Sequence, residues 1–275
     1  MTQGRTIKLS EDFVTNLAEF IYESDLIEDI VDDPDLLMRQ IRAQKKDGHV
    51  GAMLMLERLV LDAGNRGDLY IEKQTICEVQ KLIVAEQNEP LPAASSGVSG
   101  WAPLQDVSAP PTHSHSVLHP RSKLRGIADV CNKKPGGHKL PDKWIGEFRD
   151  CDVTVGNTSC PTSDQIPHLM DALLQRVRSW QKRAKLWHQW QNLNEIARFH
   201  FEFEIIHPFA DGNGRTGRAL AYYMMRYAGL KPFAFTNFDK HELYYPCFVD
   251  SKNDRLMRGY FLIKIGSDFS KLFYS

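Results

Sequence analysis

The sequence predicts an all-α fold with one short β-hairpin. Apolar residues recur at helical spacing in most segments, as at Phe13, Leu17 and Phe20 near the N-terminus. A persuasive strand-like alternation occurs only within residues 144–160, where the pair Gly156-Asn157 indicates a turn. A chain of 275 residues suits one large domain or two small ones.

Composition excludes several functional classes. The 34 Lys and Arg residues balance 35 Asp and Glu residues, so we expect no dedicated nucleic-acid binder with a globally basic surface. No apolar run is long enough for a membrane span, and the N-terminus lacks the apolar core of a secretory signal. The five cysteines are scattered without a CxxC pair, which favours free thiols over a disulfide framework or a zinc site.

Local signals order the helices of the first third. Ser10 is expected to cap the first helix, and Pro34 suits the first turn of the second. Gly48 and Gly51 interrupt the apolar pattern, which resumes at Met53.

Two later segments also indicate helices. Residues 76–83 carry apolar side chains at helical spacing, and so do residues 166–190. We expect Trp180, Trp187 and Trp190 to extend the apolar stripe of the second segment into the core.

Residues 88–122 are rich in Pro, Ser and Gly, which predicts a loop inserted within a domain. The loop contains His113, His115 and His119. Three histidines can bind a metal, but without a nearby cysteine a solvated loop is the favoured interpretation.

The densest chemistry lies in one run, HPFADGNGRTGR, from His207 to Arg218. Gly212, Gly214 and Gly217 match the dinucleotide pattern GxGxxG, and the preceding residues alternate like a strand. However, a carboxylate beside the first glycine repels a pyrophosphate, and no strand–helix repeat surrounds the run. A P-loop is also disfavoured, because the Lys and Ser/Thr that should follow the glycines are missing.

A third interpretation uses all of these residues together. Glycines and a helix that opens near Asn213 would present backbone N–H groups to an anion. Arg215 and Arg218 are three residues apart, so both can reach one polyphosphate. Asp211 is then a plausible Mg²⁺ ligand, and His207 a general base.

The same run resembles the Fic (Fido) family signature HPFx(D/E)GNGRxxR, with every specified position present. Upstream, Gly146-Glu-Phe148-Arg149 resembles the family's Gly-x-Tyr/Phe-Arg stretch. The resemblance covers roughly residues 76–269 and implies an all-α bundle with a single hairpin. That hairpin is the family's flap, matched here by Val153, Thr154, Val155 and Gly156.

The resemblance implies nucleotidyl transfer with ATP and Mg²⁺. His207 would deprotonate a hydroxyl of a target protein, which then attacks the α-phosphate. Asp211 would hold Mg²⁺, and the flap would register the target by strand-like pairing. The remaining residues expected at the nucleotide are Gly212, Asn213, Gly214, Arg215, Gly217, Arg218, Tyr244 and Tyr245. Of these, Tyr244 and Tyr245 would border the adenine, and Gly214 favours AMP transfer because phosphate-transferring relatives often carry Lys there.

The acidic stretch near the N-terminus resembles the family's inhibitory motif (S/T)xxxE(G/N). Ser24 and Glu28 match it, whereas Asp29 replaces the usual Gly or Asn. Glu28 would pair with Arg218 and displace the γ-phosphate. The alternatives are an acidic helix end facing water and a weaker match that begins at Thr15.

We therefore expect a protein adenylyltransferase, with a helical region at 1–70 that includes the inhibitory helix and a catalytic domain at 71–275. A Fic-fold phosphotransferase, a de-AMPylase and a dinucleotide-binding protein are the alternatives. The expected partner is a protein with an acceptor hydroxyl. Self-modification and homodimers are consistent with the family, and a cytoplasmic location is favoured, with secretion as an effector left open.

Overall fold

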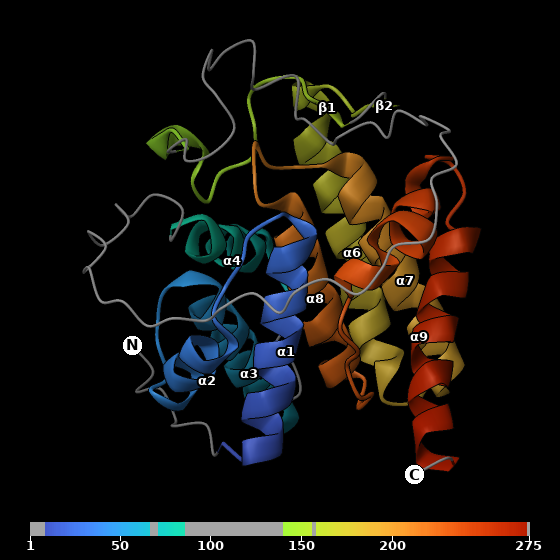
Figure 1. Cartoon of the computed structure of the whole chain (residues 1–275). Helices are drawn as coiled ribbons and strands as arrows, with labels where there is room; N and C mark the ends of the chain where they lie inside the picture. Colours follow the sequence, from blue (N-terminus) through green and yellow to red (C-terminus); the bar gives the residue numbers. More distant parts are fainter. Residues whose placement is uncertain (1–8, 67–70, 86–139, 156–157, 274–275) are drawn as a thin grey trace, which may run out of the picture.

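The computed structural model describes residues 9–66, 71–85, 140–155 and 158–273. The expected loop at 88–122, with its three histidines, and Gly156 lie outside these residues. The described chain is a helical bundle with one two-stranded hairpin, so the all-α prediction is confirmed (Figure 1). No helix in these ranges is both long and apolar enough to cross a bilayer.

The larger helices are spread over the whole described chain. They are α1 (Glu11–Ile27), α2 (Pro34–Arg42), α3 (Gly48–Arg66), α4 (Lys73–Ala85), α6 (Ile166–Ala184), α7 (Gln189–Ile206), α8 (Asn213–Tyr227) and α9 (Arg255–Phe273). Short helical turns occur at η2 (Asp142–Trp144), η3 (Ser163–Gln165), η4 (Asn237–Asp239), η5 (Lys240–Tyr244) and η6 (Tyr245–Phe248). The hairpin is β1 (Thr154–Val155) with β2 (Thr158–Ser159), antiparallel, with Thr154 opposite Ser159.

The expected caps of the first two helices are confirmed. The Ser10 hydroxyl accepts a hydrogen bond from the Phe13 N–H at 3.2 Å, and Asp33 caps α2 ahead of Pro34. The expected break at Gly51 is wrong, because α3 runs through it from Gly48. A Cβ at Gly51 would overlap the backbone of Lys46, so close chain approach, and not helix termination, explains this glycine.

Helix α8 is the centre of the bundle, with α1, α3, α4 and α7 packed around it (Figure 1). Nearly all of its side chains are buried, as expected for a helix surrounded by others. The rings of Phe20 on α1 and Tyr222 on α8 meet edge to face at 4.8 Å. The N-terminal helices therefore share one hydrophobic core with the rest of the described chain.

The structure around α7 differs from one expectation and agrees with another. The alternating run from Phe199 to Ile205, part of the disfavoured dinucleotide interpretation, belongs to α7, where aromatic side chains pack on several sides of the buried helix. The expected helix at 166–190 ends at Ala184, and Trp190 begins α7 half exposed. Trp180 is buried as expected, and its indole N–H donates to Asn192 at 2.9 Å.

Gly217 lies where α8 crosses α7. A Cβ at this position would overlap the Glu204 carboxyl oxygen Oε1 and lie 3.0 Å from the Phe203 ring. Close packing of two helices therefore explains a glycine in a helix interior, where it is otherwise unfavourable.

We predict that Gly217→Ala lowers the free energy of unfolding by about 1–3 kcal/mol, because overpacking outweighs the better helix propensity of alanine. Urea denaturation measures it. Gly259→Ala in α9 is the matched control: nothing lies within 4 Å of that Cβ, so a gain of about 0.5–1 kcal/mol is expected. Equal stabilisation by both changes would contradict the packing argument.

Candidate active site

The HPFADGNGR run forms a tight loop between α7 and α8. His207 ends α7 in the left-handed conformation, with φ at 51°, and Gly212 precedes α8 with φ at 78°. Helix α8 begins at Asn213, as expected. Two left-handed residues thus turn the chain sharply and place His207 close to the N-terminus of the central helix.

Side chains of the loop itself hold its shape. The Asn213 amide accepts from the Phe209 N–H and donates to the Phe209 carbonyl, both at 2.8 Å. Asp211 Oδ1 accepts from the Gly212 N–H at 2.6 Å. Asn213 was expected in the anion hole, but its buried side chain is committed to the loop, so only its backbone can serve there. Phe209 is fully buried against Phe148 and anchors the loop in the core.

Two buried side chains from distant elements hold the loop from outside. Gln80 of α4 donates to the Asp211 carbonyl at 3.1 Å and accepts from the Gly146 N–H at 2.6 Å. Arg149 donates through Nε to the His207 carbonyl at 2.7 Å, while its own N–H donates to the Pro208 carbonyl at 2.9 Å. Gln80 was not predicted as a site residue, because no local pattern connects α4 with the motif.

The surroundings of His207 favour the neutral form of its imidazole. Burial lowers the pKa of its imidazole to about 4, and the nearby Arg149 charge lowers it too, against a hydrogen bond to the Glu204 backbone. An imidazole with this pKa is unprotonated at neutral pH, so it can accept a proton.

The second motif arginine is held by α1. The Arg218 guanidinium is fully buried and donates through Nε to the Ser24 hydroxyl at 2.9 Å. Its Nη2 donates to the Ser24 carbonyl at 2.9 Å and to Glu28 Oε1 at 2.8 Å. Burial alone would raise the pKa of Glu28, but the paired Arg218 outweighs burial and lowers it. Ser24 and Glu28, at the C-terminal end of α1, therefore bind and neutralise the Arg218 guanidinium.

Arg215, on the first turn of α8, is also buried. Its positive charge interacts electrostatically with two carboxylates at the end of α1, those of Asp25 and Glu28. Asp25 is itself buried and lies 2.9 Å from His49 Nδ1 on α3. A Cβ at Gly214 would overlap Glu28 Oε1, so the glycine leaves room for that carboxylate at the start of α8.

The structure explains the departure from the inhibitory motif at Asp29. This residue follows α1 in the left-handed conformation, with φ at 61°. Gly and Asn adopt that conformation most readily, and Asp tolerates it better than most other residues. The Asp29 carboxylate also pairs with Lys240 of η5 at 2.9 Å.

The other expected site residues lie on two sides of the loop. Tyr244 is buried, with its hydroxyl 2.8 Å from His200 Nε2, so the core and not an open pocket surrounds it, while Tyr245 beside it is half-buried. In the flap, Val153 is buried, Thr154 is half-buried and Val155 is 36% exposed. The regular pairing there is shorter than the sequence indicated.

Glu204 is a site residue that the sequence did not single out. It lies one turn before His207, and its Oε1 is buried with no hydrogen-bond partner among the described residues. Burial raises its pKa to about 8, although Arg218 opposes the shift. The carboxyl is therefore mainly protonated at neutral pH.

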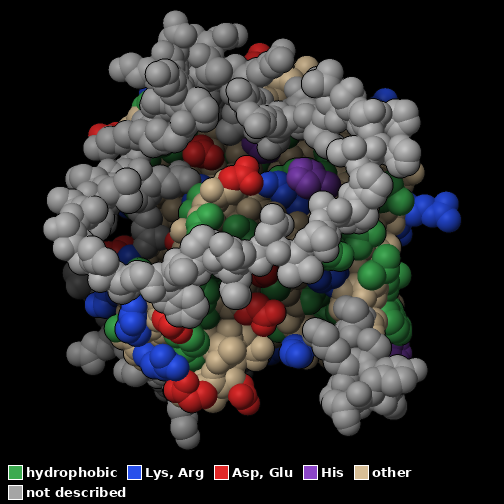
Figure 2. All heavy atoms as spheres, in the orientation of Figure 1, with side chains coloured by type: hydrophobic (Ala, Val, Ile, Leu, Met, Phe, Trp, Pro, Cys, Tyr) green, Lys and Arg blue, Asp and Glu red, His purple; other side chains and the backbone are tan. Residues whose placement is uncertain are grey.

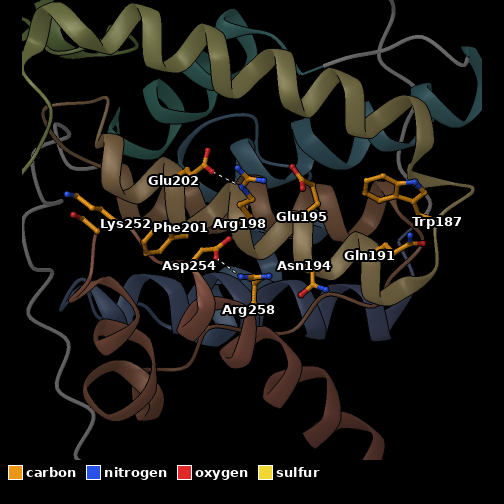
Figure 3. Close-up of a pocket in the computed structure, with 11 residues that line it drawn as sticks. Trp187, Gln191, Asn194, Glu195, Arg198, Phe201, Glu202, Lys252, Asp254 and Arg258 are labelled. Atoms are coloured by element: carbon orange, nitrogen blue, oxygen red, sulfur yellow. Dashed lines mark hydrogen bonds and ion pairs between the residues drawn. The ribbon is translucent and has the colours of Figure 1, made fainter.

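A separate groove of about 660 Å³ lies between α7 and the start of α9 (Figure 3). Two ion pairs lie along it: Arg198 with Glu202 at 2.9 Å and Arg258 with Asp254 at 2.8 Å. No residue of the motif loop lines this groove. It is a surface hollow apart from the candidate active site.

We predict that Glu204→Gln flattens the pH dependence of stability. The folded pKa of Glu204 is raised, so the folded state retains a proton that the unfolded state loses between about pH 4.5 and 8, and stability falls as pH rises through that window. The variant should gain stability relative to the parent at about pH 8 and not at about pH 4.5. Thermal unfolding across the window measures it, and a pH-independent difference would contradict the assignment.

Comparison with known proteins gives a consistent family. The Fic/DOC family model matches residues 122–225. A protein adenylyltransferase Fic from Aedes aegypti is 35% identical over 123 residues, which are 44% of this chain and 23% of that protein. A probable protein adenylyltransferase from Aquifex aeolicus is 35% identical over 183 residues, 63% of this chain and 53% of that protein. The chain thus spans about half or less of these relatives.

Solved structures share the fold. A Fic domain containing signaling protein from Bacteroides thetaiotaomicron superposes with a TM-score of 0.56 at 14% identity, over 92% of this chain and 86% of that one. Fic-1 from C. elegans superposes with a TM-score of 0.54 at 14% identity, over 96% of this chain and 66% of that one. These structures share the fold, and residues 122–225, which contain the HPFADGNGR loop between α7 and α8, belong to the Fic/DOC family.

Proposed function

We propose that this protein is a protein adenylyltransferase that transfers AMP from ATP to a Tyr, Ser or Thr hydroxyl of a protein. One observation supports the proposal above all. The loop that joins α7 to α8 is held by hydrogen bonds from distant residues, and it brings His207, whose neutral form is favoured, to the N-terminal end of α8. Arg215 and Arg218 lie on the first turns of the same helix. The adenylyltransferase names of the relatives support it.

In the proposed reaction, separate groups of the chain bind the phosphates and transfer the proton. The first N–H groups of α8, with Arg215 and Arg218, bind the phosphates. His207 takes the proton from the acceptor hydroxyl as its oxygen attacks the α-phosphorus. The bond to the β-phosphate oxygen breaks, and pyrophosphate leaves while AMP stays on the acceptor.

Asp211 suits a magnesium ion that arrives with the nucleotide. Among the described residues, no group of three His, Cys, Asp or Glu side chains gathers as a cation site. A Mg²⁺ held mainly by phosphates needs only one or two protein carboxylates, which Asp211 satisfies. When bound there, the ion would neutralise phosphate charge and offset the repulsion from this carboxylate.

We propose that Glu28 inhibits this reaction. Its pairing with Arg218 occupies the cation that would otherwise bind the γ-phosphate, so ATP would bind in an unproductive way. Residues 1–70 would then be the regulatory region and 71–275 the catalytic one. Because the Glu28 carboxylate lies at the start of α8, it could also orient a water for removal of AMP, which makes de-AMPylation the second candidate function.

The proposed partner is a protein acceptor, with self-modification and homodimers as further members of the proposal. Figure 2 shows the face seen in Figure 1, and acidic and basic side chains are interspersed over its described part. This mixed pattern does not resemble a nucleic-acid-binding surface. We place the reaction in the cytoplasm, in a reducing compartment that suits the free cysteines found among the described residues.

We predict that Glu28→Gly raises AMP transfer to protein, including self-modification, because Arg218 becomes available to the γ-phosphate. Intact-mass measurement with ATP and Mg²⁺ reads the added AMP, and it distinguishes AMP from phosphate addition. Adding His207→Ala should reduce the rate by about 100- to 10,000-fold.

Glu19→Gly is the matched control for the brake. Glu19 is exposed on the same helix, so this change loosens α1 without removing the partner of Arg218. Activation by Glu19→Gly to the same level would assign inhibition to the integrity of α1 and not to the Glu28 carboxylate.

We predict that Asp211→Asn abolishes Mg²⁺-dependent transfer in the Glu28→Gly background. The amide oxygen can still accept from the Gly212 N–H, so the loop keeps its shape while the anionic ligand is lost. Transfer rates over a Mg²⁺ titration measure it. An unchanged Mg²⁺ dependence would exclude Asp211 as the metal ligand.

A further inference from the structure

Arg149 is a buried arginine whose side chain donates to main-chain carbonyls and forms no ion pair with a carboxylate of the described residues. It is 2% exposed. Its guanidinium donates to the carbonyls of His207 at 2.7 Å, Cys151 at 2.7 Å and Pro161 at 2.6 Å, and more weakly to that of Ile206 at 3.4 Å. Three different guanidinium nitrogens take part, which a lysine cannot imitate.

One set of these carbonyls belongs to the end of α7. A helix leaves its last carbonyls without partners inside the helix, and its C-terminal end favours a cation. Arg149 supplies both needs at Ile206 and His207, and its backbone N–H donates to Pro208 at 2.9 Å. Three successive carbonyls around the left-handed His207 are thus fixed by one residue.

The other carbonyls belong to the base of the hairpin. Cys151 lies on the segment that enters β1, and Pro161 on the segment that leaves β2. The Cys160 N–H donates to the Val153 carbonyl at 3.1 Å, which extends the pairing down toward Arg149. The same planar group therefore touches both legs of the hairpin and the backbone of His207.

We propose that Arg149 is a positioning residue that couples the hairpin to His207 and so sets the imidazole against the acceptor hydroxyl presented by the flap. This inference rests on the proposed function of His207. The planar guanidinium of Arg149 fixes the geometry through several hydrogen bonds. Its positive charge, close to the imidazole of His207, disfavours the protonated form of that imidazole.

Two variants, both made in the Glu28→Gly background, distinguish the effect of the hydrogen-bond geometry from the effect of the charge. Arg149→Lys keeps the charge and loses the fork, whereas Arg149→Met loses both. Arg176→Met is the matched control, because Arg176 is a partly buried arginine that pairs with Glu195 at 2.8 Å, away from the loop.

We predict that both Arg149 variants lower kcat for AMP transfer by about 10- to 100-fold, as a small misplacement of reacting groups does. The KM for ATP should stay unchanged because α8 still binds the phosphates, while the KM for the acceptor protein rises. In addition, NMR titration should show a higher His207 pKa in Arg149→Met and a parental one in Arg149→Lys. His207→Ala identifies the imidazole resonance.

Several outcomes would overturn the proposal: parental kcat in both variants, an unchanged His207 pKa in Arg149→Met, or an equal pKa rise in Arg176→Met. If Arg149→Met fails to fold, the kcat and KM values of Arg149→Lys decide. If the Glu28→Gly parent transfers no AMP at all, the proposed function fails, and the NMR titration alone then decides whether Arg149 governs His207.

Discussion

A guanidinium buried on the central helix has to be neutralised by whatever packs against it, and in this structure α1 does so. Ser24 and Glu28 together satisfy Arg218 with a hydroxyl, a carbonyl and a carboxylate. Removing one partner of a buried ion pair leaves a costly unpaired charge, whereas replacing it with another anion does not. One cation therefore holds the end of α1 and, under the proposed function, also decides whether the phosphate site is available.

The backbone of the loop before α8 is constrained as well, because two of its residues have a positive φ angle. His207 and Gly212 both adopt the left-handed conformation, and for His207 this conformation is uncommon. Asn213 closes the loop from within, while Gln80 and Arg149 hold it from distant parts of the chain. A neutral imidazole beside a helix N-terminus is a consequence of these contacts.

Local signals made much of the fold predictable. The Ser10 cap, the first turn at Pro34 and the start of α8 at Asn213 depend on neighbouring residues. The expected break at Gly51 was wrong, because the close approach of the Lys46 backbone is a tertiary contact that neighbouring residues do not reveal. For the same reason the motif was visible in the sequence, while the contribution of Gln80, the raised pKa of Glu204 and the carbonyl contacts of Arg149 were not.

The Asn213 side chain is fully engaged in hydrogen bonds within the loop, so under the proposed function the phosphates would be bound largely by main-chain N–H groups and arginines. Such contacts recognise negative charge and spacing, which are identical in all nucleoside triphosphates. Under that proposal, discrimination among nucleobases would come from another part of the molecule, such as the segment around Tyr245. A change of preferred nucleotide could consequently evolve there without disturbing the catalytic loop.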